Sequence, residues 1–428
     1  MTGAMYAAIA GLKTHMNKMN VIGNNIANVN TTGYKAQRTI FKDAMYTMYS
    51  NGSDGTETVG SKNPSQIGYG SQISSIDLNM GSGSYTPGNS LDCMIDGDGF
   101  FLTGDKDVAN VINATNPQSF KSLSLTRVGD FKFGADGYLV DGNGNCVYGF
   151  LSLGMGPDGK NPVVSDQLVP IRLPQVEKVI VSLTAELGIG TEITADQITE
   201  DMVEGTHYEY KSVVRYPVAA TNEEGQPIKD AAGFSGEVTD IPLMDYDKYM
   251  NANPGEDAEE GAAPLELAFA QLDSISIDES TGRISGTVKD SDEWITLGFL
   301  AIGNVTNPNG VTHTGGFYYS CSDGAGDLQV SLMGGAEESL TVPGGGKLQY
   351  VNGSLLQGEG EDAEVPSQVA AIGSAGTTGL LTGGLEGSNV DLATEISEMI
   401  TTQRGYQANT RIITVTDTML EELVNMKR

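Results

Sequence analysis

The chain has 428 residues, a formal net charge of −31, 39% hydrophobic residues and 56 glycines. This length exceeds one ordinary hydrophobic core and predicts two or three structural units. The strong negative charge repels phosphate groups, which argues against nucleic acid and anionic lipid as partners. The chain has no run of about 18 apolar residues, so we expect no membrane insertion.

Residues 1–30 are predicted to form a helix that packs against other helices. Apolar or small residues recur there at alternating spacings of four and three, the pattern of paired helices. We call this set the N-terminal stripe, and it consists of Met5, Ile9, Leu12, Met16, Met19, Gly23 and Ile26. A lone helix of this length is marginal in water, so the stripe needs a partner, either the other end of the chain or another copy.

The end of this helix is marked by Asn, Thr and Gly. We expect the helix to run from Thr2 to about Asn28 and the chain to leave through a turn at Gly33. Asn and Gly tolerate left-handed backbone angles, and Asn30 and Thr31 can bond their own backbone in turns. The start of the chain lacks a charged segment followed by an apolar one, so we expect no cleaved signal peptide.

The centre is predicted to be mainly β, because short strand-like runs alternate with Asp-Gly and Asn-Gly turns. We divide it into an inner β domain, residues 86–155 and 291–355, and an outer acidic β domain inserted into it, residues 156–290. Residues 31–85 and 356–385, rich in Gly, Ser and Thr, are expected to be connecting segments.

No catalytic or metal-binding constellation is evident. The histidines and cysteines are few and widely spaced: His15, His207 and His313, and Cys93, Cys146 and Cys321. Such spacing argues against a zinc site and a disulfide framework. We therefore predict no enzymatic activity, no catalytic residue, no metal and no cofactor.

One Asp/Gly stretch is similar to a calcium loop. Residues 141–145 alternate oxygen-bearing side chains with Gly, but Cys146 and Ser152 stand where such a loop has Gly and Glu. We interpret the stretch as a hairpin turn, with calcium binding as the lesser alternative.

Residues 386–428 are predicted to form a second helix with a matching pattern. We call its set the C-terminal stripe, and it consists of Leu392, Ile396, Met399, Gln403, Tyr406, Thr410, Ile413, Asp417, Leu420 and Val424. Its polar members either restrict register and partner number or mark the edge of a narrow apolar face. The first 42 residues contain no acid, whereas this segment is acidic, which favours pairing of the two ends. The expected fold is mainly β with helical termini that pair as a coiled coil, and with two nested β domains.

Five ordered motifs resemble those of bacterial flagellar rod and hook proteins. They are Gly23–Lys35, Leu91–Phe101, Thr126–Val140, Phe299–Gly310, and Ser388–Leu392 with Gln403–Asn409. The residues that carry the two terminal signatures are Gly23, Asn24, Asn25, Asn28, Gly33, Asn389, Val390, Asp391, Gln403, Arg404 and Tyr406. Both termini are covered, whereas the acidic middle is not, and Val311 stands where the family pattern has Leu.

The resemblance implies a structural subunit that assembles into the helical tube of the flagellar hook, which joins rod to filament and transmits torque. It implies a homopolymer that meets rod, hook-cap and hook–filament junction proteins, located outside the cell and exported without a cleaved signal peptide. The alternative within the family is a distal rod protein, which shares the terminal signatures but is typically shorter. A remote alternative, a secreted acidic enzyme or calcium-binding protein, leaves both stripes unexplained.

Overall fold

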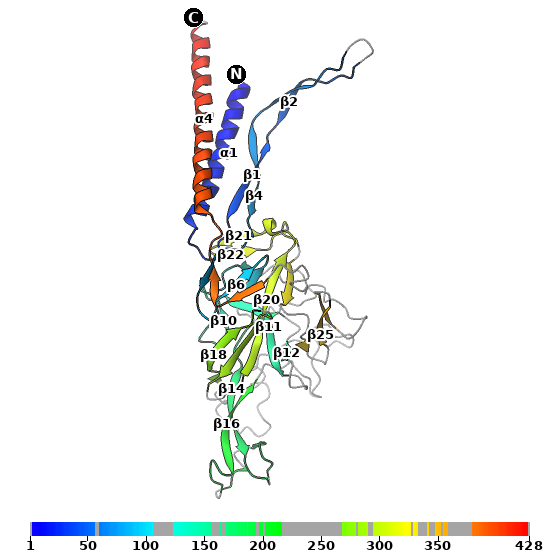
Figure 1. Cartoon of the computed structure of the whole chain (residues 1–428), viewed down its shortest axis with the longest axis vertical. Coiled ribbons are helices and arrows are strands. Elements are labelled where there is room, and N and C mark those ends of the chain that lie inside the picture. The colour runs from blue at the N-terminus through cyan, green and yellow to red at the C-terminus, as the bar shows by residue number, and fades with distance from the viewer. Residues whose placement is uncertain are drawn as a thin grey trace, which may run out of the picture. The chain divides into compact units, whose positions relative to one another are not determined.

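The computed structural model divides into two compact units (Figure 1), which are described separately. Unit 1 comprises Met1–Ser84 and Gly387–Arg428, and unit 2 comprises Tyr85–Glu386. The chain is mainly β with an α-helix at each end, as the sequence predicted. The structure describes residues 2–55, 60–105, 123–155, 162–164, 168–185, 187–193, 197–199, 202–215, 268–279, 281–289, 294–326, 328–332, 340–341, 347–351, 354–357 and 379–426.

The N-terminal helix of unit 1, α1 (Thr2–Ala27), ends close to the predicted point. The backbone N–H of Asn28 still donates to the Asn24 carbonyl at 3.1 Å. Gly33 then has a φ of 68°, in the left-handed region that favours glycine. The expected exit turn is therefore present.

The C-terminal helix, α4 (Leu392–Asn425), is the longer one. Its N-cap is Asp391, whose carboxylate accepts from the Ala393 N–H at 3.0 Å and from the Thr394 hydroxyl at 2.7 Å. An N-cap carboxylate satisfies N–H groups that have no partner inside the helix. These bonds hold the pKa of Asp391 below its usual value.

Unit 1 also contains a β ribbon between its two helices in sequence. β1 (Gln37–Asp43) pairs with β4 (Ser71–Leu78), and β2 (Tyr46–Ser50) pairs with β3 (Ser65–Gly68), both antiparallel. We call the first pair the inner ladder and the second the outer ladder. The stretch expected to be a connecting segment thus contains four strands.

The inner ladder packs against α1. The hydroxyls of Thr14 on α1 and Ser71 on β4 lie 3.1 Å apart. Gly70, with a φ of 109°, passes so close that an added Cβ would lie 2.9 Å from the Ala10 side chain. A side chain at this position would push the ribbon away from the helix.

Unit 2 consists of short strands. In chain order they are β5 (Tyr85–Pro87), β6 (Cys93–Asp96), β7 (Phe100–Gly104), β8 (Ser124–Thr126), β9 (Lys132–Phe133), β10 (Leu139–Val140), β11 (Cys146–Met155), β12 (Pro162–Val164), β13 (Val169–Pro170), β14 (Gln175–Ser182), β15 (Glu192–Ile193), β16 (Tyr208–Arg215), β17 (Ala268–Phe269), β18 (Leu272–Ile277), β19 (Arg283–Val288), β20 (Trp294–Val305), β21 (Thr312–Gly315), β22 (Tyr318–Ser320), β23 (Leu328–Leu332), β24 (Leu340–Thr341), β25 (Lys347–Val351), β26 (Ser354–Gln357), β27 (Gly379–Thr382) and β28 (Gly384–Glu386). A short 3₁₀ helix, Pro308–Gly310, follows Asn307.

The largest sheet of unit 2 follows the order β21-β22-β8-β7-β20-β11-β12-β24-β25-β26, with β18 and β19 joined to it through β20. A separate sheet contains β14 to β17. The division into an inner and an outer β domain stays a prediction. The core packs Phe101, Ile171, Leu300 and Ile302, all fully buried, against one another and their neighbours. Burial of such side chains is the main favourable term for this unit.

A buried ion pair ties the β hairpins of unit 2 to its last strand. Arg127 and Glu386 have fully buried side chains, and their charged groups lie 3.6 Å apart. Arg127 also donates to the Ile95 carbonyl at 3.0 Å and to the Gly97 carbonyl. The pair therefore joins three of the sequence segments that form this unit.

Candidate assembly interface

α1 and α4 lie side by side in unit 1 and run in opposite directions (Figure 1). A Cβ placed on Gly11 would lie 2.8 Å from Asn409 Nδ2, and one placed on Gly405 would lie 2.8 Å from the His15 ring. Four residues forward along α1 therefore correspond to four residues back along α4. At both places a glycine lets a side chain of the other helix approach its backbone.

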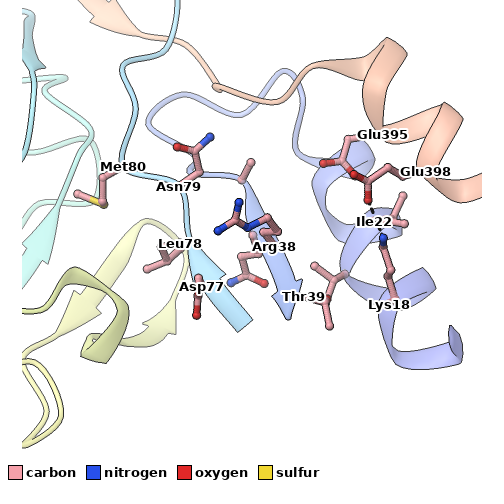
Figure 2. Close-up of a pocket in the computed structure, with 13 residues that line it drawn as sticks. Lys18, Ile22, Arg38, Thr39, Asp77, Leu78, Asn79, Met80, Glu395 and Glu398 are labelled. Atoms are coloured by element: carbon pink, nitrogen blue, oxygen red, sulfur yellow. Dashed lines mark ion pairs between the residues drawn. The ribbon is translucent and has the colours of Figure 1, made fainter. Parts of the chain in front are cut away.

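Two polar contacts also join the helices: that of Asn25 with Glu395 keeps this register, and that of Lys18 with Glu398 lies one turn away from it. Lys18 Nζ lies 2.9 Å from Glu398 Oε2, an ion pair marked by a dashed line in Figure 2, and Asn25 Nδ2 donates to Glu395 Oε1 at 2.9 Å. Burial raises the pKa of Glu395, the bond from Asn25 lowers it, and the nearby Glu398 raises it further. We call the paired residues the contact stripes, which comprise Gly11, His15, Lys18 and Asn25 on α1 and Asn409, Gly405, Glu398 and Glu395 on α4.

Asn25 is the centre of this arrangement and is only 1% exposed. Its Nδ2 also donates to the Gln37 carbonyl at 2.9 Å. Its Oδ1 accepts from the Gln37 N–H at 3.0 Å and from the Tyr34 hydroxyl at 3.1 Å. The side chain thus uses its donor and acceptor groups to join α1, the exit turn, β1 and α4.

The rest of the N-terminal signature builds the exit turn. Asn28 Nδ2 donates to the Asn24 carbonyl at 2.9 Å, and the Thr31 hydroxyl donates to Asn28 Oδ1 at 3.0 Å. Lys35 is buried, and its ammonium group donates to the Gly81 carbonyl at 2.9 Å. The signature residues therefore fix where the chain leaves α1.

Asn389 has the corresponding role at the start of α4. Its Oδ1 accepts from the Ala36 N–H at 2.7 Å, and its Nδ2 donates to the carbonyls of Asn79 and Gly81 at 2.7 and 2.9 Å. It therefore holds the exit turn, the end of β4 and the start of α4 together. Asn25 and Asn389 are two clamps on the same junction.

A cavity of about 330 Å³ lies within unit 1 beside this junction (Figure 2). Ile22 and Lys18 of α1, Arg38 and Thr39 of β1, and Glu398 of α4 are among the residues that line it. Charges of both signs and an apolar side chain meet there. The cavity thus separates part of the helix pair from the inner ladder.

The two predicted stripes lie beside the contact stripes. Leu12, Met16 and Met19 each follow a contact residue of α1 by one position, and Ile396, Met399, Tyr406 and Thr410 do the same on α4. None of the residues of either predicted stripe is fully buried in the single chain. Ile9, Met16, Leu392, Ile396 and Val424 are 46%, 43%, 43%, 45% and 69% exposed.

Both predicted stripes lie on one side of the helix pair. Successive residues of an α-helix are rotated by about 100°. In two antiparallel helices that face each other, an equal rotation about each axis leads to the same side of the pair. A helix pair joined by small and polar residues therefore presents a second, apolar face.

The remaining signature residues take no part in the hydrogen bonds that the Asn25 and Asn389 side chains make. Gly23 has open space around its Cβ direction, Val390 and Tyr406 are half-buried, and Gln403 and Arg404 are exposed. The contact residues Gly11, His15, Lys18, Glu395 and Asn409 were not singled out as helix-pairing positions from sequence. The opposite charges of the two ends were the one sequence signal for their pairing, and the ion pair of Lys18 with Glu398 agrees with it.

The candidate calcium stretch is a turn whose carboxylate already has donors. Asp141 Oδ1 accepts from the N–H groups of Asn143 and Asn145, both at 2.9 Å, and Oδ2 accepts from the Tyr318 hydroxyl at 2.5 Å. In the part of the chain that the structure describes, no three His, Cys, Asp or Glu side chains are placed to share a metal ion. No described helix is long and apolar enough to cross a bilayer.

Both ends of the chain match family models. Residues 5–35 match the flagella basal body rod protein family, and residues 381–426 match the C-terminal family of flagellar basal body rod FlgEFG proteins. The flagellar hook protein FlgE of Borreliella burgdorferi is 26% identical over 486 aligned positions, which cover 100% of both chains. The chain belongs to the flagellar rod and hook protein family.

Two further relatives are similar to this chain over their full length. The hook protein FlgE of Treponema pallidum is 26% identical, and the basal-body rod protein FlgG of Bacillus subtilis 27% identical, each with 100% of both chains covered. A solved Helicobacter pylori hook protein FlgE2 has 11% identity, a TM-score of 0.27 and coverage of 57% of this chain and 95% of that one, too low to support an argument. The chain is a hook-type structural subunit of the bacterial flagellum, and the rod alternative is weaker.

Proposed function

We propose that copies of this chain assemble through unit 1 into the tube of the hook, which joins the rod to the filament and transmits torque. The observation that carries the proposal is the helix pair. Its contact stripes use small and polar residues, whereas the N-terminal and C-terminal stripes are covered only in part. Apolar side chains in a three-four pattern favour contact with further helices.

The proposed contact between copies is helical packing of the coiled-coil type. The residues assigned to it are Met5, Ile9, Leu12, Met16, Met19, Ile26, Leu392, Ile396, Met399, Tyr406, Ile413, Leu420 and Val424. All of these side chains are at least partly exposed in one chain, which supports the assignment because a tube supplies further neighbours. Unit 2, with its nested β domains, forms the outward-facing part in this proposal.

The role is structural, with no catalytic step. The subunit lies outside the cell, leaves it without a cleaved signal peptide, and meets rod, hook-cap and junction proteins at the tube ends. The similarity to the Bacillus subtilis rod protein supports a second candidate, a distal rod subunit. Both candidates use the same helix pair, and the number of full-length hook relatives favours the hook.

Electron microscopy of the purified protein at rising concentration tests the proposal. We expect hollow tubes above a critical concentration. A flagellated strain that lacks its own copy provides the second readout, because hook loss leaves rods without filaments, whereas rod loss removes the distal rod as well. A protein that stays monomeric at every concentration and does not restore the hook would contradict the proposal.

A further inference from the structure

His15 of α1 lies where this helix meets both α4 and β1. Its ring packs edge-on against the Phe41 ring of β1, with the two centroids 6.1 Å apart. On the side of α4, a Cβ added at Gly405 would lie 2.8 Å from the imidazole. The other two histidines of the sequence, His207 and His313, belong to unit 2. His15 is therefore the one histidine of unit 1, and it sits inside the contact between the helices.

The Nδ1 atom of His15 is buried and has no hydrogen-bond partner among the residues that the structure describes. The facing part of α4 supplies none, because the backbone groups around Gly405 bond within the helix and glycine has no side chain. A neutral imidazole can carry its proton on Nε2, whereas both nitrogens of an imidazolium are donors. Proton uptake would therefore leave a charged donor buried without an acceptor, which is costly.

The charges around His15 also oppose a second positive charge. Lys18 Nζ lies 5.8 Å from the centroid of the same Phe41 ring. The charged residues near His15 on the elements packed there are Lys13 and Lys18 on α1, Glu398, Arg404 and Arg411 on α4, and Arg38, Lys42 and Asp43 on β1, while β4 has none before Asp77. Cations outnumber anions in this set. Both nearby carboxylates already have partners, since Glu398 pairs with Lys18 at 2.9 Å and Asp43 accepts from the Tyr46 hydroxyl at 3.0 Å.

The protonation state of His15 is therefore linked to the stability of the helix pair. Burial lowers the pKa of His15 from its ordinary value of 6.5, and the charge of Lys18 lowers it further. When the helices separate, the ring returns to water and binds a proton more tightly. The pair thus keeps this contribution in full above about pH 6.5 and loses it as the pH falls toward the folded-state pKa. The direction is opposite to that of Glu395, whose raised pKa favours the pair at low pH.

We propose that His15 is a pH-sensitive switch of the helix pair, and that proton uptake on its ring forces α1 and α4 apart at Gly405. Mildly acidic medium then opens a contact that is closed at neutral pH. The effect on the helix pair concerns a single chain. Its consequence for tubes, a loss of assembly in acid, rests on the proposed function.

Amide exchange in the full chain tests the switch. His15→Gln replaces the ring with a polar side chain that does not titrate, and His313→Gln is the matched control at an exposed histidine of unit 2. Exchange along α1 and α4 is measured at about pH 7.5 and about pH 5.5, on either side of the ordinary histidine pKa, and corrected for the intrinsic effect of pH. Comparison at each pH removes the contribution of Glu395, which all three chains share.

The native chain and His313→Gln should lose protection of α1 and α4 by up to about tenfold at the lower pH, because that pH lies about one unit below the ordinary pKa. His15→Gln should show the same protection at both pH values. A loss of protection in His15→Gln as large as that in the native chain would overturn the proposal.

A titration of the native chain does not depend on how well His15→Gln folds. The ring Cε1 protons of the three histidines are followed by NMR, and the signals are assigned from the single Gln variants. We expect the midpoint of His15 to lie below 6.5. A midpoint at or above 6.5 would overturn the proposal, because the proton would then not oppose the helix pair.

Tube formation separates this inference from the proposed function. The critical concentration of the native chain should rise about tenfold between the same two pH values, and that of His15→Gln should stay constant. Tubes with an equal pH response in both chains would overturn the switch and leave the proposed function intact. Absence of tubes from the native chain at neutral pH would overturn the proposed function, while exchange and titration still decide the role of His15.

Discussion

Asn25 of α1 donates a 2.9 Å hydrogen bond to Glu395 of α4, a residue 370 positions further along the chain. The same amide bonds Gln37 and Tyr34 and is buried. A single side chain thus joins both ends of the protein to the ribbon between them. Its neighbours lose several hydrogen bonds together if it is removed.

Asn25→Ala should open this junction. Buried groups left without a partner cost about 1–3 kcal/mol each, so we expect faster amide exchange at the start of α4 and in β1. Asn20→Ala is the control, because Asn20 is exposed on the same helix. Equal exchange in both variants would mean that the Asn25 bonds do not hold the junction.

Glu395 offers a test by pH. Its pKa is raised, mainly by burial, so the protonated form stabilises the fold below the ordinary value of 4.5 and this contribution is lost as pH rises through the folded-state pKa. Glu395→Gln keeps an acceptor for Asn25 without the charge. At neutral pH we expect Glu395→Gln to be at least as stable as the native chain in thermal unfolding, and Glu395→Ala to be less stable. A Gln variant as weak as the Ala variant would show that the charge itself is needed.

The close approach of the helices can be tested at two glycines. Gly405→Leu forces the His15 ring out of place, because a Cβ there would lie 2.8 Å from it. At Gly23 an added Cβ meets nothing within 4 Å, and leucine also favours helix by about 0.8 kcal/mol over glycine, so Gly23→Leu is the control. Amide exchange in the monomer should therefore speed up along α1 in the first variant only. Similar exchange in both variants would rule out the antiparallel contact at Gly405.

Unit 2 depends on the buried pair of Arg127 and Glu386. Glu386→Gln leaves a buried guanidinium without its counter-charge, and such a change costs about 3–5 kcal/mol. We expect a clear fall in the unfolding temperature of unit 2 by calorimetry. Lys132→Gln, a change at an exposed cation of the same unit, should leave it unchanged. A native unfolding temperature for Glu386→Gln would show that the pair adds no stability.

The predicted stripes can be tested at Ile413. Ile413→Asp places a carboxylate in the proposed contact between copies, at a cost of several kcal/mol per subunit on the order expected for a buried unpaired charge. Tubes should be lost while unit 2 keeps its unfolding temperature. Ile413→Leu conserves volume and should still form tubes. Normal tubes from Ile413→Asp would place this residue in solvent.

The helices and the β centre were predictable because their signals are local. Three-four spacing of apolar residues predicted both helices. Asn28 and Gly33 predicted the end of α1 to within one residue. The terminal signatures gave the family. Each of these features lies within a few residues of sequence.

The contact stripes were not predictable in the same way. Gly11, His15, Asn25 and Asn409 are small or polar. A search for periodic apolar residues therefore does not select them and selects the residue that follows each of them instead. Their pairing depends on close backbone approach between segments nearly 400 residues apart, which no local pattern encodes. Asn25 was identified only as a residue of the N-terminal signature, and the structure shows that it also bonds α4.

The ribbon was missed for a different reason. Asn51-Gly52 and Asp54-Gly55 do mark a turn between β2 and β3, but the residues on either side of it were interpreted as a connecting segment. Its strands also do not alternate apolar and polar residues, because neither face of the outer ladder is covered within one chain.

A helical reconstruction of the tubes by electron cryomicroscopy tests the central claim most directly. The account predicts α1 and α4 paired in antiparallel fashion in each subunit, with Leu12, Met16, Met399 and Ile413 buried against helices of neighbouring copies. A tube in which these side chains face solvent, and unit 2 alone joins the subunits, would contradict it.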